Sequence, residues 1–143
     1  MNRAKSVSRR QFLTTTGAVA GAAMLPVTSR AQGANEKLNI ACVGVGGRGR
    51  GDLDGVMREN IVAICDVDSK NLDSARTRIE KAKGEAWRAK TFSDYRVMFD
   101  KMHANIDAVV VATPDHMHGA ISATAMFLIK HADTEKPLAH NVY

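Results

Sequence analysis

The sequence has few cysteines, no internal repeat and no apolar run long enough to cross a membrane. Cys42 and Cys65 both lie inside short apolar runs, a setting typical of small buried side chains rather than of a disulfide framework. The longest stretch of small and apolar residues, at 13–25, is shorter than the roughly 20 residues that a transmembrane helix needs. These features exclude a disulfide-stabilised scaffold, a repeat protein and a membrane-spanning segment.

Acidic residues are missing from the first 31 positions, which carry five Lys or Arg residues. The formal net charge of +5 therefore belongs entirely to this segment, because the other 112 residues carry 15 basic and 15 acidic side chains. A neutral remainder gives no support for binding to a nucleic-acid backbone. We predict that nucleic acid is not among the partners.

The same segment has the order of an export signal. Arg9 and Arg10 precede the short apolar stretch, and small residues up to Ala31 suit a signal-peptidase site. Paired arginines before a weakly apolar stretch are typical of a twin-arginine signal. We predict that residues 1–31 are a signal peptide read by that export machinery, and that residues 32–143 are periplasmic or otherwise extracytoplasmic. A disordered basic tail is the alternative.

Predicted strands and helices alternate along the rest of the chain, which is long enough for one domain. Apolar runs predict buried strands, and apolar residues at helical spacing predict helices between them. The predicted strands are 38–44, 61–67, 106–113 and, more weakly, 86–92, and the predicted helices include 68–83, 93–102 and 114–128. This order predicts an α/β fold with a doubly wound parallel sheet of the Rossmann type, incomplete at its C-terminal end.

A glycine-rich loop joins the first predicted strand to the helical segment after it. Its spacing fits G-x-G-x-x-G, in which glycines allow a tight turn, close approach of a pyrophosphate and close packing of the next helix. We predict a phosphate-binding loop made of Gly44, Val45, Gly46, Gly47, Arg48 and Gly49. Arg48 either adds a charged contact or is an exposed arginine without a special role. A plain flexible turn is the alternative for the whole loop.

An acidic residue follows the second predicted strand. In the segment ICDVD, Asp66 lies 20 residues after Gly46, where dinucleotide-binding folds place an acid that accepts hydrogen bonds from the adenosine ribose. A carboxylate there repels a 2′-phosphate, so we predict NAD as the cofactor in preference to NADP. The alternative is that Asp66 or Asp68 only caps the following helix.

Together with two later segments, these motifs resemble the Gfo/Idh/MocA oxidoreductases. The resemblance rests on VGVGGRGRG (43–51), ICDVD (64–68), DYRVMFDKMHANIDAVVVATPDHMHGAISATAM (94–126) and EKPLAHNVY (135–143). It covers nearly all of residues 38–143 and is nearest to the exported branch that carries twin-arginine signals. It implies a nucleotide-binding domain followed by an α/β substrate domain, whose open sheet often forms an interface in homo-oligomers.

The resemblance also implies roles for individual residues. Thr113 and Pro114 would line the nicotinamide side of the crevice, with His118 nearby. Glu135 and Lys136 match the family's EKP signature, whose lysine is catalytic and lies beside the nicotinamide and the substrate hydroxyl. A positioned cation there stabilises the oxyanion that develops when an alcohol is oxidised. An ordinary surface lysine is the alternative for Lys136.

The two histidines of that region do not predict a metal site. His116 and His118 are two residues apart, so their side chains diverge on a helix, and no thiolate or third ligand lies close in the sequence. We therefore predict no bound metal.

The segment before the EKP signature departs from the family's pattern. Ile129 stands where members have a glycine that ends the helix, and the polar segment ADT (132–134) replaces an apolar strand. A carboxylate such as Asp133 is costly in a buried strand. We therefore expect a frayed fifth strand, with Lys136 held less well than catalysis needs, since a misplacement of about 1 Å can cost roughly a hundredfold in rate.

Three functions stay open, because 143 residues hold one domain and the family's substrate domain is expected to be absent. In the first, the chain is the nucleotide-binding half of an NAD-dependent oxidoreductase acting on a sugar, polyol or related carbonyl compound. Alternatively, it is part of an NAD-dependent glycoside hydrolase, since some exported relatives of this superfamily cleave glycosides. The third possibility is a non-catalytic NAD-binding remnant of a truncated gene. Whether the chain by itself is an enzyme is left open.

Overall fold

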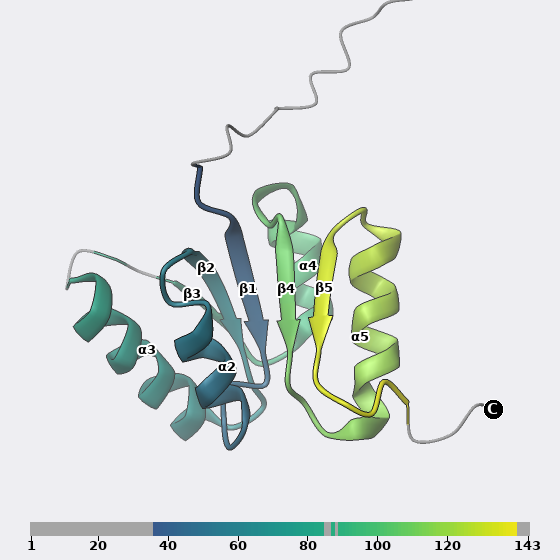
Figure 1. Ribbon diagram of the computed structural model, residues 1–143, viewed down its shortest axis with the longest axis horizontal. Helices are drawn as coiled ribbons and strands as arrows, with labels where there is room; N and C mark the ends of the chain where they lie inside the picture. The colour runs from purple at the N-terminus through teal and green to yellow at the C-terminus, as the bar shows by residue number, and fades with distance from the viewer. Residues whose placement is uncertain (1–35, 85–86, 88, 140–143) are drawn as a thin grey trace, which may run out of the picture. The chain divides into compact units, whose positions relative to one another are not determined.

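Five parallel strands form one sheet in the computed structural model, which describes residues 36–84, 87 and 89–139. They lie in the order β3-β2-β1-β4-β5 (Figure 1). This is the strand order of a doubly wound dinucleotide-binding sheet, which confirms the predicted fold class. The predicted signal peptide, residues 1–31, lies outside the described residues. The strands are β1 (Asn39–Val43), β2 (Asn60–Cys65), β3 (Lys90–Phe92), β4 (Ala108–Val111) and β5 (His131–Thr134).

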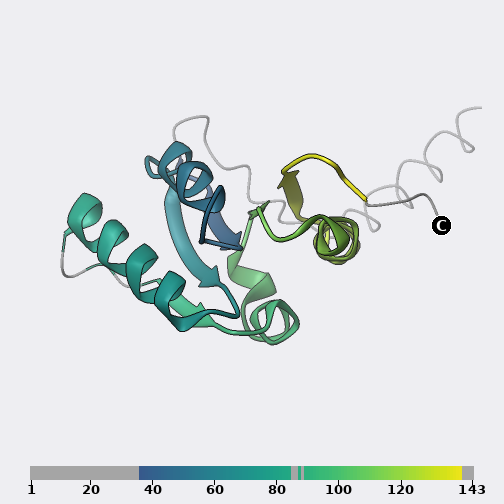
Figure 2. The same ribbon diagram turned by 90° about the horizontal axis from the view of Figure 1, so that it is seen from below.

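Helices cover both faces of this sheet. Helices α2 and α3 pack on one face, and α4 and α5 pack on the other (Figure 2). Successive residues of a strand point into opposite cores, because side chains alternate across a sheet. Ile40 of β1 lies in the core under α2 and α3, and Ala41 lies in the core under α4 and α5. The helices are α2 (Gly49–Gly55), α3 (Ser69–Lys83), α4 (Tyr95–Met102) and α5 (Asp115–Phe127), with a 3₁₀ turn at His103–Asn105.

The helices that follow strands β2, β3 and β4 begin where the sequence predicts. The Asp68 carboxylate accepts a hydrogen bond from the Lys70 amide at 2.9 Å and caps α3. In the same way, Asp94 accepts from the Arg96 amide at 2.8 Å and caps α4. Pro114 is the cap residue of α5, where its missing N–H leaves no intrahelical bond unmade. Each helix therefore starts directly after the carboxyl end of a strand.

Helix α5 ends in a Schellman motif whose left-handed residue is an isoleucine. The Lys130 amide donates to the Ala125 carbonyl oxygen at 3.0 Å, and the Ile129 amide donates to the Met126 carbonyl oxygen at 2.9 Å. These are the two bonds that define this type of helix end. Ile129 has a φ of +59°, so it adopts the backbone conformation that favours glycine. Ile129 thus ends the helix at the position where the family resemblance expects a glycine.

The expectation of a frayed fifth strand is wrong. Strand β5 pairs in parallel with β4, in register from Ala108 and His131 to Val111 and Thr134. The Asp133 side chain is exposed, because β5 lies at the edge of the sheet. Its carboxylate therefore stays in water and escapes the desolvation cost that a central strand would impose.

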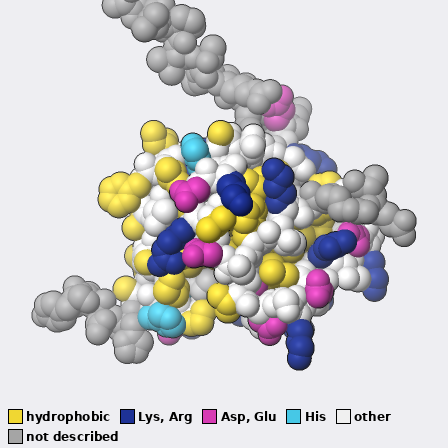
Figure 3. Space-filling model, turned by 180° about the vertical axis from the view of Figure 1, so that it is seen from behind, with side chains coloured by type: hydrophobic (Ala, Val, Ile, Leu, Met, Phe, Trp, Pro, Cys, Tyr) yellow, Lys and Arg dark blue, Asp and Glu magenta, His cyan; other side chains and the backbone are white. Residues whose placement is uncertain are grey.

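The surface along α5 carries several apolar side chains. Met126, Phe127 and Ile129 are exposed, and Figure 3 shows hydrophobic side chains gathered on the side of the molecule formed by α5. Within the described residues, none of the helices combines the length and the apolar character needed to cross a membrane.

The two cysteines are free and buried, as the sequence predicts. Cys42 belongs to the core under α2 and α3, and Cys65 belongs to the core under α4 and α5. Burial raises the pKa of each thiol to about 12, so both are protonated at neutral pH.

Candidate functional site

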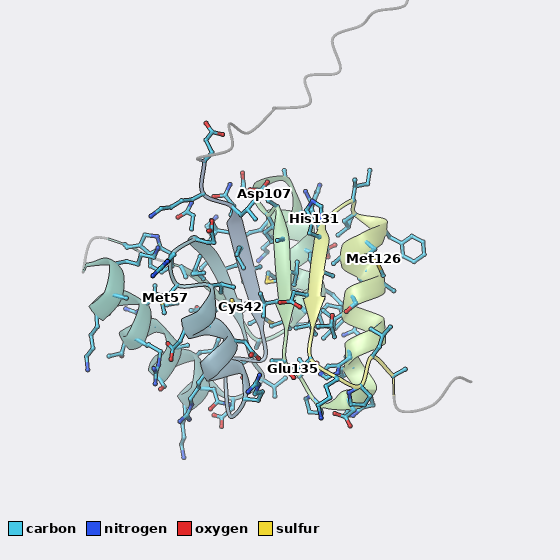
Figure 4. All side chains as sticks on the ribbon, in the orientation of Figure 1. Cys42, Met57, Asp107, Met126, His131 and Glu135 are labelled. Atoms are coloured by element: carbon cyan, nitrogen blue, oxygen red, sulfur yellow. The ribbon has the colours of Figure 1, made fainter. Side chains whose placement is uncertain are left out.

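The loops that follow β1, β2, β3 and β4 surround one cavity at the carboxyl edge of the sheet. Its volume is about 720 Å³, within the range of roughly 300–1,000 Å³ that is typical of small-molecule sites. In Figure 4, Glu135 lies at this edge, whereas Asp107 and His131 lie at the opposite edge. The cavity lies next to β1 and β4, where the chain order of the strands reverses, which is where doubly wound sheets bind ligands.

The glycine-rich loop is shaped by contacts that leave no room for side chains. Gly44 has a φ of +82°, and a Cβ added to it would lie 2.6 Å from the Ala112 carbonyl oxygen. A Cβ on Gly49 would overlap the carbonyl oxygen of Gly44. The Gly44 amide donates to the Cys65 carbonyl oxygen at 2.8 Å. The loop is therefore held tightly between the ends of β1, β2 and β4.

Asp66 binds this loop directly. Its Oδ2 accepts hydrogen bonds from the amides of Val45 at 2.9 Å and Gly46 at 3.2 Å. Its Oδ1 accepts from the Asp68 amide at 2.9 Å. A carboxylate has about four acceptor positions. The Asn71 Nδ2 also lies at hydrogen-bond distance from both oxygens, 3.4 Å from each, so a ligand hydroxyl would have to displace this long contact. Of the two aspartates, Asp68 caps α3, and Asp66 joins β2 to the loop after β1.

Asn71 also lies at the loop, and the sequence analysis did not identify it. Its side-chain amide fills the space beside Gly46 where a Cβ would project. Its Nδ2 lies 3.4 Å from both carboxylate oxygens of Asp66. The only signal in the sequence is its place early in α3, five residues after Asp66, and this spacing alone does not indicate a contact with the loop.

An ion pair joins the glycine-rich loop to the end of β5. Arg48 Nε lies 2.8 Å from Glu135 Oε1 and 3.5 Å from Asp52 Oδ1. The hydrogen bond from Arg48 lowers the pKa of Glu135. Burial, followed by the charge of Glu135, raises the pKa of Asp52. Two residues predicted as separate cofactor contacts, Arg48 and Glu135, are thus paired with each other.

Residues after β3 line the end of the cavity near Asp66, and sequence reasoning missed them. They are Ser93, Asp94, Tyr95 and Arg96. The Arg96 guanidinium lies over the Tyr95 ring, 4.6 Å from its centroid, and 3.5 Å from Asp94. They follow the weakest predicted strand, and only its place in the sheet shows that its end faces the cavity.

Of the residues predicted at the nicotinamide side, Thr113 and Pro114 line the cavity and His118 does not. Thr113 and Pro114 line the cavity, together with His116 and Met117. Among the described residues, the Thr113 hydroxyl oxygen is buried and has no hydrogen-bond partner. His118 is only 1% exposed and lies behind these turns, with both ring nitrogens at backbone carbonyl oxygens.

Lys136 directly follows the ion-paired Glu135. Its side chain is exposed, and the Glu135 amide before it donates to the Val111 carbonyl oxygen at 3.0 Å. The end of β5 is therefore anchored beside β4, next to the turn that carries Thr113. In the part of the chain that the structure describes, no group of three or more His, Cys, Asp or Glu side chains could hold a metal ion.

The residues around the cavity fit a dinucleotide. Gly47 lines the cavity and has open space where a Cβ would project, so the loop backbone is accessible where a pyrophosphate would lie. Asp66 lines one end of the cavity with a carboxylate that can accept from a ribose hydroxyl, and Thr113 lines the cavity near β4. The backbone amides donate, the carboxylate accepts and the hydroxyl can do either, which suits phosphate, ribose and amide recognition.

Comparisons with known proteins agree with this geometry. The family model described as "Oxidoreductase family, NAD-binding Rossmann fold", Gfo/Idh/MocA, matches residues 38–143, and a model of the twin-arginine signal sequence matches residues 6–26. A glycosyl hydrolase family 109 protein of Stenotrophomonas maltophilia is 31% identical over 132 residues, which are 85% of this chain and 28% of that protein. The chain spans about a quarter of the length of the curated relatives that it matches.

Solved structures share the fold. The scyllo-inositol dehydrogenase of Lactobacillus casei, solved with NAD(H) and scyllo-inositol, has a TM-score of 0.63 at 24% identity, over 74% of this chain and 30% of that chain. The myo-inositol 2-dehydrogenase of Lactobacillus plantarum has a TM-score of 0.64 at 25% identity, over 75% of this chain and 30% of that chain. Over residues 38–143, the chain therefore belongs to the Gfo/Idh/MocA oxidoreductase family and has its NAD-binding Rossmann fold.

Proposed function

We propose that the cavity at the carboxyl edge of the sheet binds NAD, and that the chain is the nucleotide-binding part of an NAD-dependent oxidoreductase acting on a sugar, polyol or related carbonyl compound. The observation that carries the proposal is the contact between Asp66 and the glycine-rich loop. This contact supports the proposal, because a carboxylate suited to the adenosine ribose lies beside backbone that can approach a pyrophosphate.

Different residues along the cavity would bind different parts of the cofactor. Gly46, Gly47 and Arg48 line it on the loop side and would hold the pyrophosphate. Asp66 would accept from the adenosine ribose, and Thr113 would contact the nicotinamide end. Arg48 then exchanges its carboxylate partner Glu135 for a phosphate, which costs little because its side chain is 74% exposed.

The acidic end of the cavity favours NAD over NADP. Asp66 and Asp68 both line this end, and a 2′-phosphate would bring two further negative charges beside them. Arg96 is the cation at the same end, but it lies 3.5 Å from Asp94 and over the Tyr95 ring. A free arginine is what NADP-binding sites of this fold use, so the paired Arg96 supports the same choice.

The chemistry follows from the cofactor and one cation. Nicotinamide, when bound, accepts or donates the hydride of an alcohol and carbonyl interconversion. Lys136 lies at the end of β5, beside the turn of Thr113, and is exposed. There its ammonium group would stabilise negative charge that develops on the substrate oxygen.

Two other outcomes are consistent with the same cavity. The match to a glycosyl hydrolase family 109 protein favours NAD-assisted glycoside cleavage as the second candidate. Cleavage of a glycoside without net formation of NADH would identify it. Binding of NAD without turnover of either kind would identify a non-catalytic module.

The destination of the protein is part of this proposal. The twin-arginine signal at residues 6–26 is typical of proteins that are exported after folding. We propose a periplasmic or other extracytoplasmic location. Because free NAD is expected to be scarce there, the cofactor would be bound before export, and NAD should co-purify with the exported protein.

Calorimetric titration of the chain with NAD and NADP tests the binding site. We expect NAD to bind about tenfold or more tightly than NADP. The variant Asp66→Ala should weaken NAD binding by about 10- to 100-fold, because hydrogen bonds to a charged group contribute roughly 1.5–3 kcal/mol.

The matched control is Asp68→Ala, which removes a carboxylate from the same segment but leaves the loop contacts intact. We expect it to change NAD affinity by less than about threefold, since its side chain caps α3 and does not bind the loop. Absence of a response to NAD, or equal affinity of the Asp66→Ala variant and the unmodified chain, would overturn the proposal.

A further inference from the structure

We propose that His118 is a positioning residue, which ties the turn that carries Lys136 to the turn that carries Thr113. The inference rests on the proposed function, because it assigns these two turns to the nicotinamide end of the cavity. His118 itself does not line the cavity, so its effect would pass through the backbone of the two turns and not through contact with the cofactor.

The geometry of His118 is that of a bridge between two segments. Its Nε2 lies 2.5 Å from the Thr113 carbonyl oxygen, and its Nδ1 lies 2.7 Å from the Pro137 carbonyl oxygen. The side chain is 1% exposed, so water does not compete for either contact. A neutral imidazole carries one N–H and donates to only one of these two carbonyl oxygens, whereas the imidazolium form donates to both. The imidazole therefore spans the ends of β4 and β5 from a third element, helix α5.

Ser122 makes a second bridge one helical turn later. Its hydroxyl oxygen lies 2.5 Å from the Thr134 hydroxyl oxygen, and its side chain is 3% exposed. Residues four apart lie on the same face of a helix, so His118 and Ser122 face β5 together. We call this pair the α5 clamp. Two of its three partners, Thr134 and Pro137, stand immediately before and after Glu135 and Lys136.

The turn after Lys136 lies close to α5. A Cβ added to Gly119 would lie 3.4 Å from the Leu138 carbonyl oxygen, so the segment after Lys136 runs directly along the helix. On its other side, the Glu135 amide donates to the Val111 carbonyl oxygen at 3.0 Å. The backbone around Lys136 is therefore fixed from β4 and from α5, although the Lys136 side chain is exposed.

The two ends of the cavity are therefore held in place by different contacts. The adenosine end depends on Asp66 and the glycine-rich loop, whereas the nicotinamide end depends on the α5 clamp. Loss of the clamp should therefore affect ligands that reach the Lys136 turn and spare ligands that do not. A merely structural role for His118 predicts equal losses for both kinds of ligand.

The test compares NAD with ADP, which has the adenosine and pyrophosphate groups but no nicotinamide. In the variant His118→Phe, which keeps a ring but no hydrogen-bonding atoms, we expect NAD affinity to fall about tenfold. Affinity for ADP should stay within about twofold. The control His103→Phe alters an exposed histidine with one carbonyl partner, that of Phe99, far from the cavity, and should change neither affinity.

Hydrogen exchange supplies a readout that does not depend on any ligand. In His118→Phe, amides of residues 131–138 should exchange faster, while those of β2 keep their protection. If the phenylalanine variant fails to fold, His118→Gln is measured instead, since its side-chain amide can still donate to one of the carbonyl oxygens and the variant should show a smaller effect in the same direction.

Equal loss of NAD and ADP affinity, or unchanged exchange of residues 131–138, would overturn the inference. If the unmodified chain binds neither ligand, the proposed function fails. In that case the exchange experiment still decides whether His118 fixes the turn, so the two failures are distinguishable.

Discussion

At the scale of the residue, Asp66 has two tasks that compete for one carboxylate. Three of its acceptor positions are occupied by the amides of Val45, Gly46 and Asp68. These bonds shape the loop before a ligand arrives, so the loop need not be ordered by binding. The remaining acceptor capacity faces the Asn71 side-chain amide at 3.4 Å, so a ribose hydroxyl would form about one strong bond by displacing that long contact.

Asp52 is a second carboxylate whose surroundings disfavour its charge. Its Oδ2 is buried and, among the described residues, has no hydrogen-bond partner. Burial and the neighbouring Glu135 raise its pKa above the ordinary value of 3.8. An aspartate with a raised pKa binds more protons in the folded than in the unfolded chain, so the free energy of unfolding falls as the pH rises through this range.

We therefore expect Asp52→Asn to stabilise the chain at neutral pH. The melting temperature should rise by about 2–4 °C at pH 7, because the amide carries no charge to desolvate. The gain should shrink as the pH falls through the raised pKa toward 3.8, where the unmodified side chain is protonated too. Thermal melts followed by circular dichroism between about pH 3.5 and pH 8 measure both effects.

Asp54→Asn is the control for this prediction, because Asp54 lies on the same helix but pairs with Arg78 at 2.9 Å on the surface. It should give no gain at any pH. If the Asp52→Asn variant is less stable than the unmodified chain at about pH 7, the attraction between the Asp52 carboxylate and Arg48 outweighs the cost of desolvating that carboxylate.

At the scale of the element, the end of α5 shows that a helix stop does not require glycine. The Schellman bonds of Ile129 and Lys130 are complete, and the β-branched side chain of Ile129 is 94% exposed. A non-glycine residue in this left-handed conformation costs about 1–3 kcal/mol. The cost stays uncompensated by burial, since the side chain packs against almost nothing.

We expect Ile129→Gly to stabilise the chain by about 1 kcal/mol, which is the relieved strain less the entropy that a glycine gains in the unfolded chain. Urea denaturation measures the change in the free energy of unfolding. Ile129→Ala is the matched control, because it removes the branched side chain but keeps the Cβ that causes the strain. A gain as large in the alanine variant would attribute the effect to the side chain and contradict the backbone explanation.

Strand β5 shows why residue types alone mispredicted one element. The charged Asp133 indicated that residues 132–134 would not form a buried strand. That inference holds only where both faces of the strand are covered. The position of β5 at the edge of the sheet leaves Asp133 in water, while Ala132 packs against the core. Burial of a strand depends on its place in the sheet, which a local sequence pattern does not contain.

At the scale of the whole molecule, the fold could be predicted because its central strands are covered on both sides. Continuous apolar runs such as Val109 to Val111 have no other stable position in a domain of this size. The strand β3 was predicted only weakly, since it is short and two of its three residues are exposed. Edge strands of this kind leave little hydrophobic pattern.

The candidate site could be predicted where it depends on backbone and not where it depends on long-range pairing. The glycine spacing and Asp66 follow from the requirements of one turn and one strand end. The ion pair of Arg48 with Glu135 joins residues 87 positions apart, and the two partners of His118 come from separate turns. No local spacing encodes such contacts.

The export signal gives a prediction for the chain as a whole. Replacing both Arg9 and Arg10 by lysine should abolish export while leaving the folded domain unchanged, because the signal is read as the arginine pair and not as net positive charge. Immunodetection in periplasmic and cytoplasmic fractions measures the outcome. The charge-matched variant Arg30→Lys, outside the matched segment, should still be exported, and continued export of the double variant would contradict the assignment.

One thiol lies in each of the two cores, so the reactivity of each thiol reports when the helices over that face separate from the sheet. Cys42 reacts with a thiol reagent only when the α2 and α3 layer separates from the sheet, and Cys65 only when the α4 and α5 layer does. Comparing the labelling rates of the two sulfur atoms would therefore reveal whether the two halves of the sandwich loosen together or one before the other.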